Sequence, residues 1–338
     1  VLPALRVVSS YDIVREYSGS SFFDAWTYYG QYDNLTLGDV NYLDQSDAVS
    51  QKLTYTDDNG HAIIKVDNTT NVPWNDKRNS IRITSQDSYG VGSLWVIDLL
   101  HIPYGCSVWP AFWTAGTEWP ANGEIDIIEA INLMSNNQAA LHTTGGCTVP
   151  TNSSETGQLT TTDCSQGSGC VVAETAENSF GAGFAAAGGG VWATQFDDAG
   201  IYIWFWSRPN VPASITGATS TSSLNTSEWG TPSASYPSSS SCEISNYFGP
   251  QNLVFDITLC GDWAGIASAY NATCGSSGPT GLCYNDMVVG DGSKYDDAYF
   301  EVNYVRAYTT GAAPTPTGTS GSSSSAASGA QVSTTSTS

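Results

Sequence analysis

The sequence predicts an all-β fold. Its 338 residues include 34 glycines, 11 tryptophans, 18 tyrosines and 10 phenylalanines, together with short β-branched runs, a composition typical of strands joined by tight turns. Before the C-terminal tail, no segment has the apolar spacing of an amphipathic helix. A chain that is 40% hydrophobic can bury one large core or two small ones. Nothing in the sequence requires two domains.

Apolar segments bounded by Asn, Asp and Gly turns predict the individual strands. We expect strands at residues 61–67, 80–85, 93–101, 123–130, in the segment LHTTGGC that begins at residue 141, and at 201–207, 253–259 and 300–308. Residues 147–170 read as a long loop fixed by disulfides, and residues 213–241 as a surface excursion with Trp229 as its only large anchor. The sequence GDWAG at 261–265 predicts a tight loop that presents Trp263.

The segment GEIDIIEA at residues 123–130 places three carboxylates among β-branched residues. On a strand, side chains two apart share a face, so Glu124 and Asp126 lie together and Glu129 has the opposite parity. One extra residue at Ile127 or Ile128 would bring Glu129 to the same face. The sequence therefore predicts a β-bulge at one of these two isoleucines.

With the bulge, the carboxyl groups of Glu124 and Glu129 can approach to about 5 Å, the separation that retaining glycosidases use. In such enzymes one carboxylate is the nucleophile and the other is the acid and base. The alternative is a solvated acidic strand face without catalytic function. The motif alone leaves both interpretations open.

Charge limits the classes of partner. The formal net charge is -22, with only ten Lys and Arg residues, which argues against nucleic acids and anionic membranes. The partner should be neutral or cationic. Because so many carboxylates are tolerated best where some are protonated, we expect the protein to work in an acidic medium.

Cysteines and sequons indicate a secreted glycoprotein. The eight cysteines show no paired CxxC spacing, which disfavours zinc and favours disulfides, although eight cysteines allow 105 pairings. We expect N-glycosylation at sequons, which occur at Asn34, Asn68, Asn152, Asn225 and Asn271. Val1 is not an initiator methionine, which is consistent with a removed presequence, and no apolar run is long enough to span a membrane.

The C-terminal tail has a different composition from the rest of the chain. Residues 310–338 are mainly Ser, Thr, Gly, Ala and Pro, so we expect a disordered, O-glycosylated stalk after a domain at residues 1–309. The protein is expected to be secreted or associated with a cell wall. Attachment through a GPI anchor is an open alternative that no surviving hydrophobic signal supports.

Aromatic residues cluster just before the acidic segment. Trp109, Trp113 and Trp119 lie among Pro and Gly, and indole faces stack well on sugar rings. For each Trp taken singly, burial in the core is the alternative. His142 has no second His or Cys at ligand spacing, which favours a hydrogen-bonding role over a metal ligand.

These blocks resemble glycoside hydrolase family 16, and within it the fungal endo-1,3(4)-β-glucanases, or laminarinase-like enzymes. The similarity runs from about Tyr17 to Tyr308 and rests on NVPWNDKRNSIRIT, GCSVWPAFWT, GEIDIIEA, LHTTGGC and FDITLCGDWAG, in that order. The resemblance implies a concanavalin A-like β-jelly-roll sandwich of two curved antiparallel sheets. A concave cleft across one sheet would hold an extended polysaccharide.

The resemblance also implies roles for individual residues. Glu124 matches the nucleophile, Glu129 the general acid and base, and Asp126 the residue that tunes both. The residues that match cleft-lining positions are Trp113, Trp119, His142 and Trp263.

The function expected from all of this is retaining, endo-acting hydrolysis of β-1,3 or mixed β-1,3-1,4 glucans. A cell-wall transglycosylase is the main alternative, and a non-catalytic lectin the weaker one, since a lectin would not need all three carboxylates. Neither a cofactor nor a metal is expected, because no Asp/Asn loop has calcium-binding spacing. The partner is a β-glucan polysaccharide, and the protein is expected to be monomeric.

Overall fold

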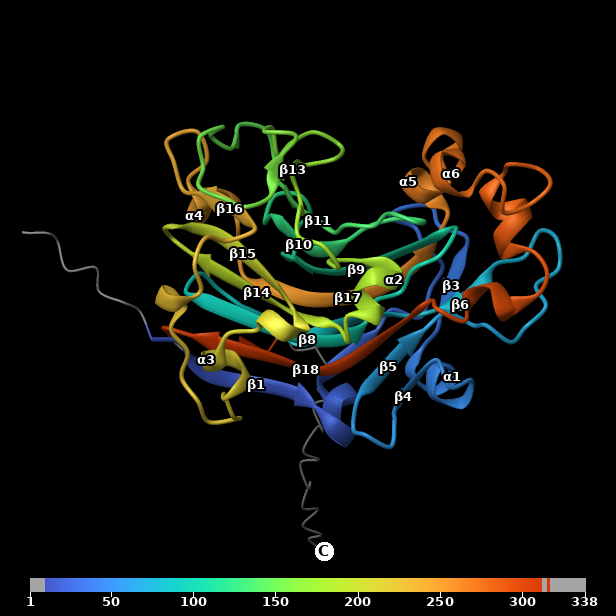
Figure 1. The fold of residues 1–338 in the computed structure, drawn as a ribbon, viewed down its shortest axis with the longest axis horizontal. Helices are drawn as coiled ribbons and strands as arrows, with labels where there is room; N and C mark the ends of the chain where they lie inside the picture. Colours follow the sequence, from blue (N-terminus) through green and yellow to red (C-terminus); the bar gives the residue numbers. More distant parts are fainter. Residues whose placement is uncertain (1–9, 312–314, 317–338) are drawn as a thin grey trace, which may run out of the picture.

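The computed structural model describes residues 10–311 and 315–316. Two large antiparallel sheets pack face to face and form a sandwich (Figure 1). The predicted all-β jelly-roll class is confirmed. Among the described residues, no helix is both long and apolar enough to cross a membrane.

In the described residues the first sheet has eight strands, in the order β16-β15-β14-β8-β18-β5-β4 with β1 beside β18. Their bounds are β1 Asp12–Ser18, β4 Thr54–Thr56, β5 Ala62–Lys65, β8 Ser93–His101, β14 Gly190–Asp197, β15 Gly200–Ser207, β16 Ala234–Pro237 and β18 Tyr299–Thr309.

The second sheet has nine described strands, in the order β12-β13-β11-β10-β9-β17-β7-β19 with β2 beside β7. Their bounds are β2 Trp26–Tyr28, β7 Arg82–Tyr89, β9 Val108–Ala115, β10 Glu124–Glu129, β11 Gln138–His142, β12 Gln158–Leu159, β13 Cys170–Ala173, β17 Gln251–Leu259 and β19 Thr315–Pro316. A separate parallel pair joins β3 Val40–Tyr42 to β6 Arg78–Ser80.

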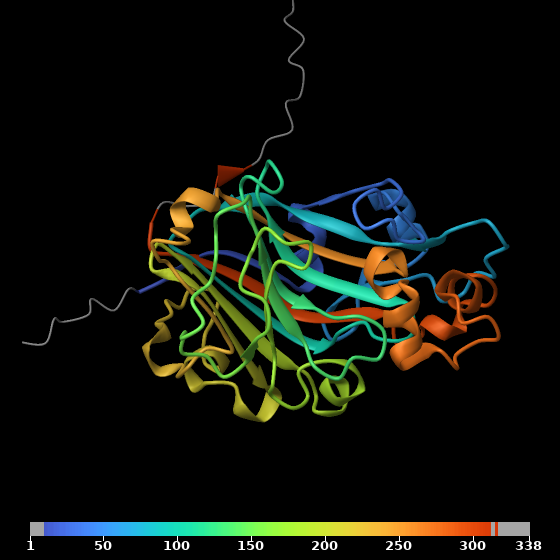
Figure 2. The same cartoon turned by 90° about the horizontal axis from the view of Figure 1, so that it is seen from above.

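The helices are short, and the longest described one, α6, has eight residues. The α-helices are α1 Gln45–Ser50, α2 Gly181–Ala186, α3 Ala213–Thr216, α4 Ile244–Tyr247, α5 Gly261–Ala264 and α6 Ala267–Cys274. The short 3-10 helices are η1 Gly19–Ala25, η2 Arg208–Asn210, η3 Thr226–Glu228 and η5 Gly292–Tyr295, and η4 Tyr284–Val288 is a π-helix. In both ribbon views α5 and α6 lie at one end of the sheets (Figure 1 and Figure 2).

The period-2 pattern of the strands separates the core from the cleft. On β9, Phe112 points into the core and packs against Phe255 of β17, with ring centroids 4.5 Å apart. Its neighbours Ala111 and Trp113 point the other way and line a cleft. The core face of the sheet therefore anchors the strands, which leaves the opposite face available for polar groups.

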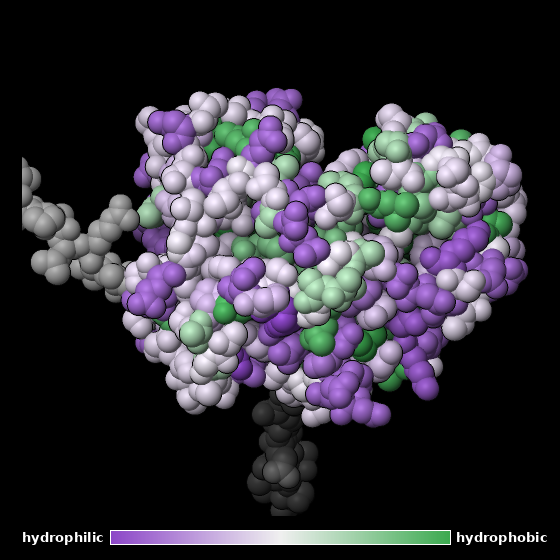
Figure 3. Space-filling model, viewed as in Figure 1, coloured by the Kyte–Doolittle hydropathy of each residue, from purple (hydrophilic) through white to green (hydrophobic). Residues whose placement is uncertain are grey.

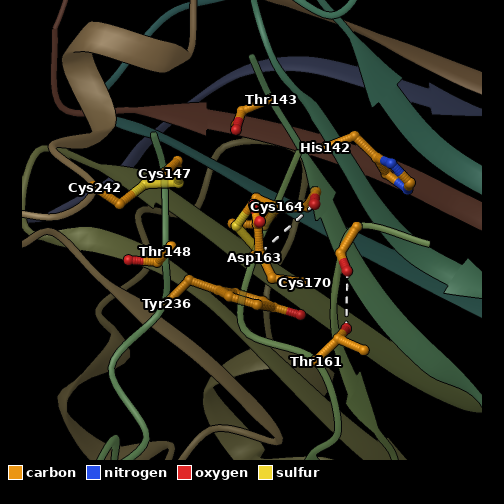
Figure 4. Close-up of a disulfide and its surroundings, with 12 residues drawn as sticks. His142, Thr143, Cys147, Thr148, Thr161, Asp163, Cys164, Cys170, Tyr236 and Cys242 are labelled. Carbon is orange, nitrogen blue, oxygen red and sulfur yellow. Dashed lines mark hydrogen bonds between the residues drawn. A yellow bond between two sulfur atoms is a disulfide. The ribbon is translucent and has the colours of Figure 1, made fainter. Parts of the chain in front are cut away.

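All eight cysteines form disulfides, as expected. The pairs, which the sequence left open, are Cys106–Cys274, Cys147–Cys242, Cys164–Cys170 and Cys260–Cys283. Figure 4 shows Cys147–Cys242 and Cys164–Cys170 close to one another; the first ties the start of the segment at residues 147–170 to Cys242, and the segment, expected to be a loop, includes the short strand β12.

Three expectations need correction. Residues 261–264 form the helical turn α5, where a tight non-helical loop was expected. The excursion at residues 213–241 includes the strand β16, which pairs with β15, although Trp229 is buried as expected. Beyond Thr309, Thr315–Pro316 pairs with β7, because strand pairing requires backbone groups and no apolar side chain. Residues 312–314 and 317–338 of the expected tail lie outside the described residues.

Candidate active site

A cleft of about 340 Å³ lies on the outer face of the second sheet. The molecular surface is hollowed between the lobe that carries β13 and β16 and the lobe that carries α5 and α6 (Figure 3). Strands β7, β9, β10 and β17 supply the floor, and the β9–β10 loop and residues 33–36 supply the rims. An open groove of this kind suits an extended ligand more than a small enclosed one.

Strand β10 carries all three predicted carboxylates into the cleft. Its pairing with β9 runs regularly from Glu124 to Asp126 and then advances two residues to Ile128 while β9 advances one. The predicted bulge is therefore present, and Ile127 is the extra residue. It restores the parity of Glu129, so that Glu124, Asp126 and Glu129 all line the cleft while the isoleucines are buried in the core.

Indole groups from both sides hold the two glutamates. Trp119 Nε1, from the β9–β10 loop, donates to Glu124 Oε2. Trp109 Nε1, on β9, donates to Glu129 Oε1 at 2.9 Å. An N–H donor favours the ionised form of a carboxyl group and fixes its direction. The two glutamates are thus oriented by different tryptophans.

Asp126 is almost fully buried between the glutamates, and His142 lies beside it. The distance from His142 Nε2 to Asp126 Oδ2 is 3.3 Å. His142 faces Glu124 across the β10–β11 pair. The same edge of the ring lies close to Gly169, where an added Cβ would meet Leu141 O at 2.5 Å and His142 Nε2 at 3.0 Å. Gly169 lies between Cys164 and Cys170, so the loop closed by this disulfide packs beside His142.

Burial raises the pKa of every carboxyl group in this set. It raises the pKa of Glu124 to about 8, with the charge of Asp126 adding to the effect, and that of Glu129 to about 7, with the charge of Glu124 adding. Burial also raises the pKa of Asp126 well above its ordinary value. A carboxyl group that donates a proton needs a raised pKa, whereas one that acts as a nucleophile must be ionised. In the free protein both are raised, because desolvation acts on both glutamates and they share protons with Asp126.

The predicted aromatic residues occupy different positions. Trp113 and Trp119 line the cleft, the first 9% exposed and the second 64% exposed. Trp263 lies behind this layer and packs edge-on against Trp109, with centroids 5.3 Å apart. His142 contacts Asp126. Neither His142 nor Trp263 is among the residues that line the cavity itself.

The opposite wall of the cleft contains residues that sequence reasoning missed. Asp256 accepts hydrogen bonds from Trp113 Nε1 at 2.7 Å and from Tyr42 Oη at 3.1 Å. The guanidinium of Arg82 lies 5.2 Å from the Trp113 ring centroid. Burial raises the pKa of Asp256 to about 6, and the charge of Arg82 opposes that shift. A lone acid within the apolar segment LVFDITL was the signal that could have revealed Asp256.

Two groups of described residues have ligand atoms within 4.8 Å of one another, close enough for one cation. One is Glu124, Asp126 and His142, and the other is Asp57, His61 and Glu301 on the far sheet. In the second group His61 Nδ1 already lies 2.8 Å from Glu301 Oε1.

The expected sequons are all within the described residues. Four of the asparagines are exposed, at positions 34, 152, 225 and 271. Asn68 is half-buried, and its Nδ2 donates to Asp296 at 2.7 Å. Glycosylation of any of them stays a prediction.

Two oriented glutamates with a buried aspartate between them lie on the floor of an open groove, and paired carboxylates in such a groove are typical of glycoside hydrolases. Residues 26–308 match the family model described as XgeA-like, catalytic GH16 domain. The chain belongs to glycoside hydrolase family 16, and the resemblance found in the sequence is confirmed.

Relatives share most of this chain. A protein of Aspergillus clavatus named "Probable endo-1,3(4)-beta-glucanase" is 38% identical over 314 residues, which cover 91% of this chain and 48% of that protein. A Schizosaccharomyces pombe protein named as a probable glycosidase is 36% identical over 306 residues, which cover 88% of this chain and 69% of that protein. The chain spans about half the length of the first of these relatives.

Solved structures agree with the fold. GH16 Laminarinase 16A from Phanerochaete chrysosporium, solved with β-glucans in both donor and acceptor sites, has a TM-score of 0.83 and 36% identity, covering 89% of this chain and all of that one. A second structure, of an elongating GH family 16 β-1,3-glucosyltransferase, has a TM-score of 0.81 and 36% identity, covering 88% of this chain and all of that one.

Proposed function

We propose that the protein is an endo-acting, retaining β-glucanase that hydrolyses β-1,3 or mixed β-1,3-1,4 glucans. One observation carries the proposal: the bulge in β10 brings Glu124 and Glu129 onto the cleft face, each with an indole N–H donor. The open groove fits cleavage within a chain. The names of the relatives and the β-glucans bound in the similar laminarinase support the substrate class.

In the first step, the Glu124 carboxylate attacks the anomeric carbon from the side opposite the leaving group. Glu129 gives its proton to the glycosidic oxygen, which leaves as a sugar hydroxyl, and an ester joins Glu124 to the glycosyl unit. Asp126 supplies the proton-sharing partner that orients Glu124. Burial raises the pKa of Glu129 to about 7 and that of Glu124 to about 8, so the reactive form is the one in which Glu129 keeps its proton while Glu124 has lost its own.

In the second step, Glu129 is a carboxylate and takes a proton from water. The resulting hydroxide equivalent attacks the anomeric carbon, the ester bond breaks, and Glu124 leaves as a carboxylate. Two displacements at the same carbon retain the β configuration. At the end of the second step Glu129 is again protonated and Glu124 is again a carboxylate.

The second candidate is a cell-wall transglycosylase. Here a sugar hydroxyl replaces water in the second step, and the chain grows instead of being cut. The likeness to the elongating β-1,3-glucosyltransferase favours keeping this alternative. A non-catalytic lectin is disfavoured, because binding alone gives no reason for one buried and two half-buried acids side by side in the cleft.

The remaining proposals concern the whole protein. We propose a secreted or wall-associated, N-glycosylated monomer whose catalytic domain ends near residue 309 and is followed by a Ser/Thr-rich tail. The four disulfides support an oxidising compartment.

A substrate panel tests the activity. Reducing ends should appear from laminarin and barley β-glucan and not from xylan or carboxymethyl cellulose. Release from xylan alone would overturn the substrate class, and binding to laminarin without turnover would favour the lectin. Product sizing with an added acceptor oligosaccharide separates the two enzymes, since dominant products longer than the donor would establish transglycosylation.

A further inference from the structure

The bulge that brings Glu129 into the cleft leaves backbone groups without strand partners. On β11, the pairing goes from Ala140, opposite Asp126, to Gln138, opposite Glu129, so three steps on β10 face two on β11. Inside this irregularity lie the Ile127 carbonyl and the Glu129 N–H. A buried backbone N–H or carbonyl without a hydrogen-bond partner destabilises the fold, so these two groups of the bulge need partners from outside the strand pairing.

One side chain satisfies both groups. Asn137 Oδ1 accepts from the Glu129 N–H at 2.9 Å, and Asn137 Nδ2 donates to the Ile127 carbonyl at 2.9 Å. Asn137 directly precedes β11 and is 3% exposed. Its amide therefore bridges the bulge in the way that a ladder residue would bridge a regular strand.

The backbone of Asn137 is itself fixed. Its N–H donates to Ser179 Oγ at 3.1 Å, and its carbonyl accepts from the Glu174 N–H at 2.9 Å. Ser179 and Glu174 are both buried. The bridging amide thus has little freedom to follow the strand if the strand shifts.

We propose that Asn137 is a positioning residue for the reaction: it locks the bulged backbone and so sets where the Glu129 carboxyl lies as proton donor. The role rests on the proposed function. Trp109 directs the carboxyl end of the same side chain. Without the amide bridge, the strand can relax toward regular pairing, which rotates Glu129 away from the glycosidic oxygen.

The simpler interpretation is that Asn137 only stabilises the loop before β11. A matched control is available next to it. Asn136 is half-buried, and its Nδ2 donates to Ala176 O at 3.2 Å without touching β10. Asn136→Ala removes two loop hydrogen bonds, to Ala176 O and from Ser135 Oγ, and leaves the bulge intact.

The experiment compares Asn137→Ala with Asn136→Ala on two substrates. Laminarin has a leaving group that needs a proton, whereas a dinitrophenyl β-laminaribioside does not. Asn137→Ala should lower kcat/KM on laminarin on the order of 10- to 100-fold and lower kcat/KM on the aryl glycoside far less, because kcat/KM reports the first step, in which the aryl leaving group needs no proton. Asn136→Ala should leave both substrates near wild type.

Two further readouts distinguish positioning from loop stability. If Glu129 moves out of its buried position, its pKa falls, and the alkaline limb of the laminarin profile moves to lower pH. In a Glu129→Ala background, adding Asn137→Ala should give no further loss on the aryl glycoside. Asn137→Asp keeps an acceptor for the Glu129 N–H and should retain part of the lost activity; it also serves if the alanine variant does not fold.

Equal losses on both substrates with an unmoved alkaline limb would overturn the positioning role, as would similar behaviour of Asn136→Ala. A wild-type protein that turns over no β-glucan would instead overturn the proposed function. The wild-type measurement therefore separates the two failures.

Discussion

Trp119 tests whether a tryptophan in the cleft acts through its face or through its N–H. The side chain is 64% exposed on the β9–β10 loop, and its Nε1 donates to Glu124. Trp119→Phe keeps a ring for stacking on a sugar and removes the donor. Trp119→Ala removes both. The pair of variants therefore separates stacking from stabilisation of the Glu124 carboxylate.

The expected magnitude follows from the exposure. A hydrogen bond to a charged group contributes about 1.5–3 kcal/mol, and solvent screening at this exposed side chain favours the lower end. About 1.4 kcal/mol corresponds to roughly tenfold, so Trp119→Phe should lower kcat/KM about tenfold. Loss of stacking adds about 1 kcal/mol in Trp119→Ala, mainly as a higher KM.

The pH profile gives the decisive readout. The Trp119 N–H lowers the pKa of Glu124 against the larger effect of burial, so removing it raises that pKa further. Glu124 must be ionised to attack, and the acidic limb of kcat/KM should move to higher pH in both variants. Trp74→Phe is the control, because Trp74 is 67% exposed and lies outside the cleft lining. An unmoved acidic limb in Trp119→Phe would refute the electrostatic role.

Three further predictions concern the carboxylates and a buried cation. Azide should rescue Glu129→Ala on an activated aryl β-glycoside and give the β-glycosyl azide, whereas Glu124→Ala should give the α product; exchanged products would mean exchanged roles. A buried acid with a raised pKa contributes stability that is complete below its unfolded pKa, about 4, and lost as pH rises through the folded value. The unfolding temperature should therefore decrease as pH rises from about 4 to about 8, the pKa of Glu124 in the folded protein. The double variant Glu124→Gln, Glu129→Gln should show a weaker dependence of unfolding temperature on pH. The control Asp24→Asn, at an exposed position, should keep the wild-type dependence. Arg78 is fully buried and donates to four backbone carbonyls, so Arg78→Met should lower the urea-unfolding free energy by at least about 2 kcal/mol; a change near zero would contradict this account.

Local pattern was enough to predict most strands and the bulge. Residues 93–101 match β8 at both ends, and the segment at residues 253–259 falls within β17. Alternation and β-branched content act over a few residues, which a single sequence displays directly. The bulge followed from parity alone, since three acids on one strand could share a face in no other register.

Long-range contacts were beyond that reasoning. Tyr42 and Asp256 are 214 positions apart and meet at a hydrogen bond in the cleft wall. Cys106 pairs with Cys274 across 168 positions. Such contacts depend on how the strands are ordered in the two sheets and how the sheets pack together. The alternation of apolar and polar residues along one strand does not specify either. The pKa of Glu124 was missed for the same reason, because desolvation is a property of the assembled cleft.

The spacing of Glu124 and Glu129 on β10 depends on the bulge between them. Glu129 lies five positions after Glu124, and the bulge at Ile127 absorbs one of these steps, which leaves the four regular steps that return a side chain to the same face. The inserted residue is an isoleucine whose side chain is 1% exposed in the core. Core burial therefore stabilises the irregularity that the cleft face needs, and the Asn137 amide satisfies the backbone groups that burial alone would leave unpaired. The strand is held from its apolar side so that its acidic side can be placed against a sugar.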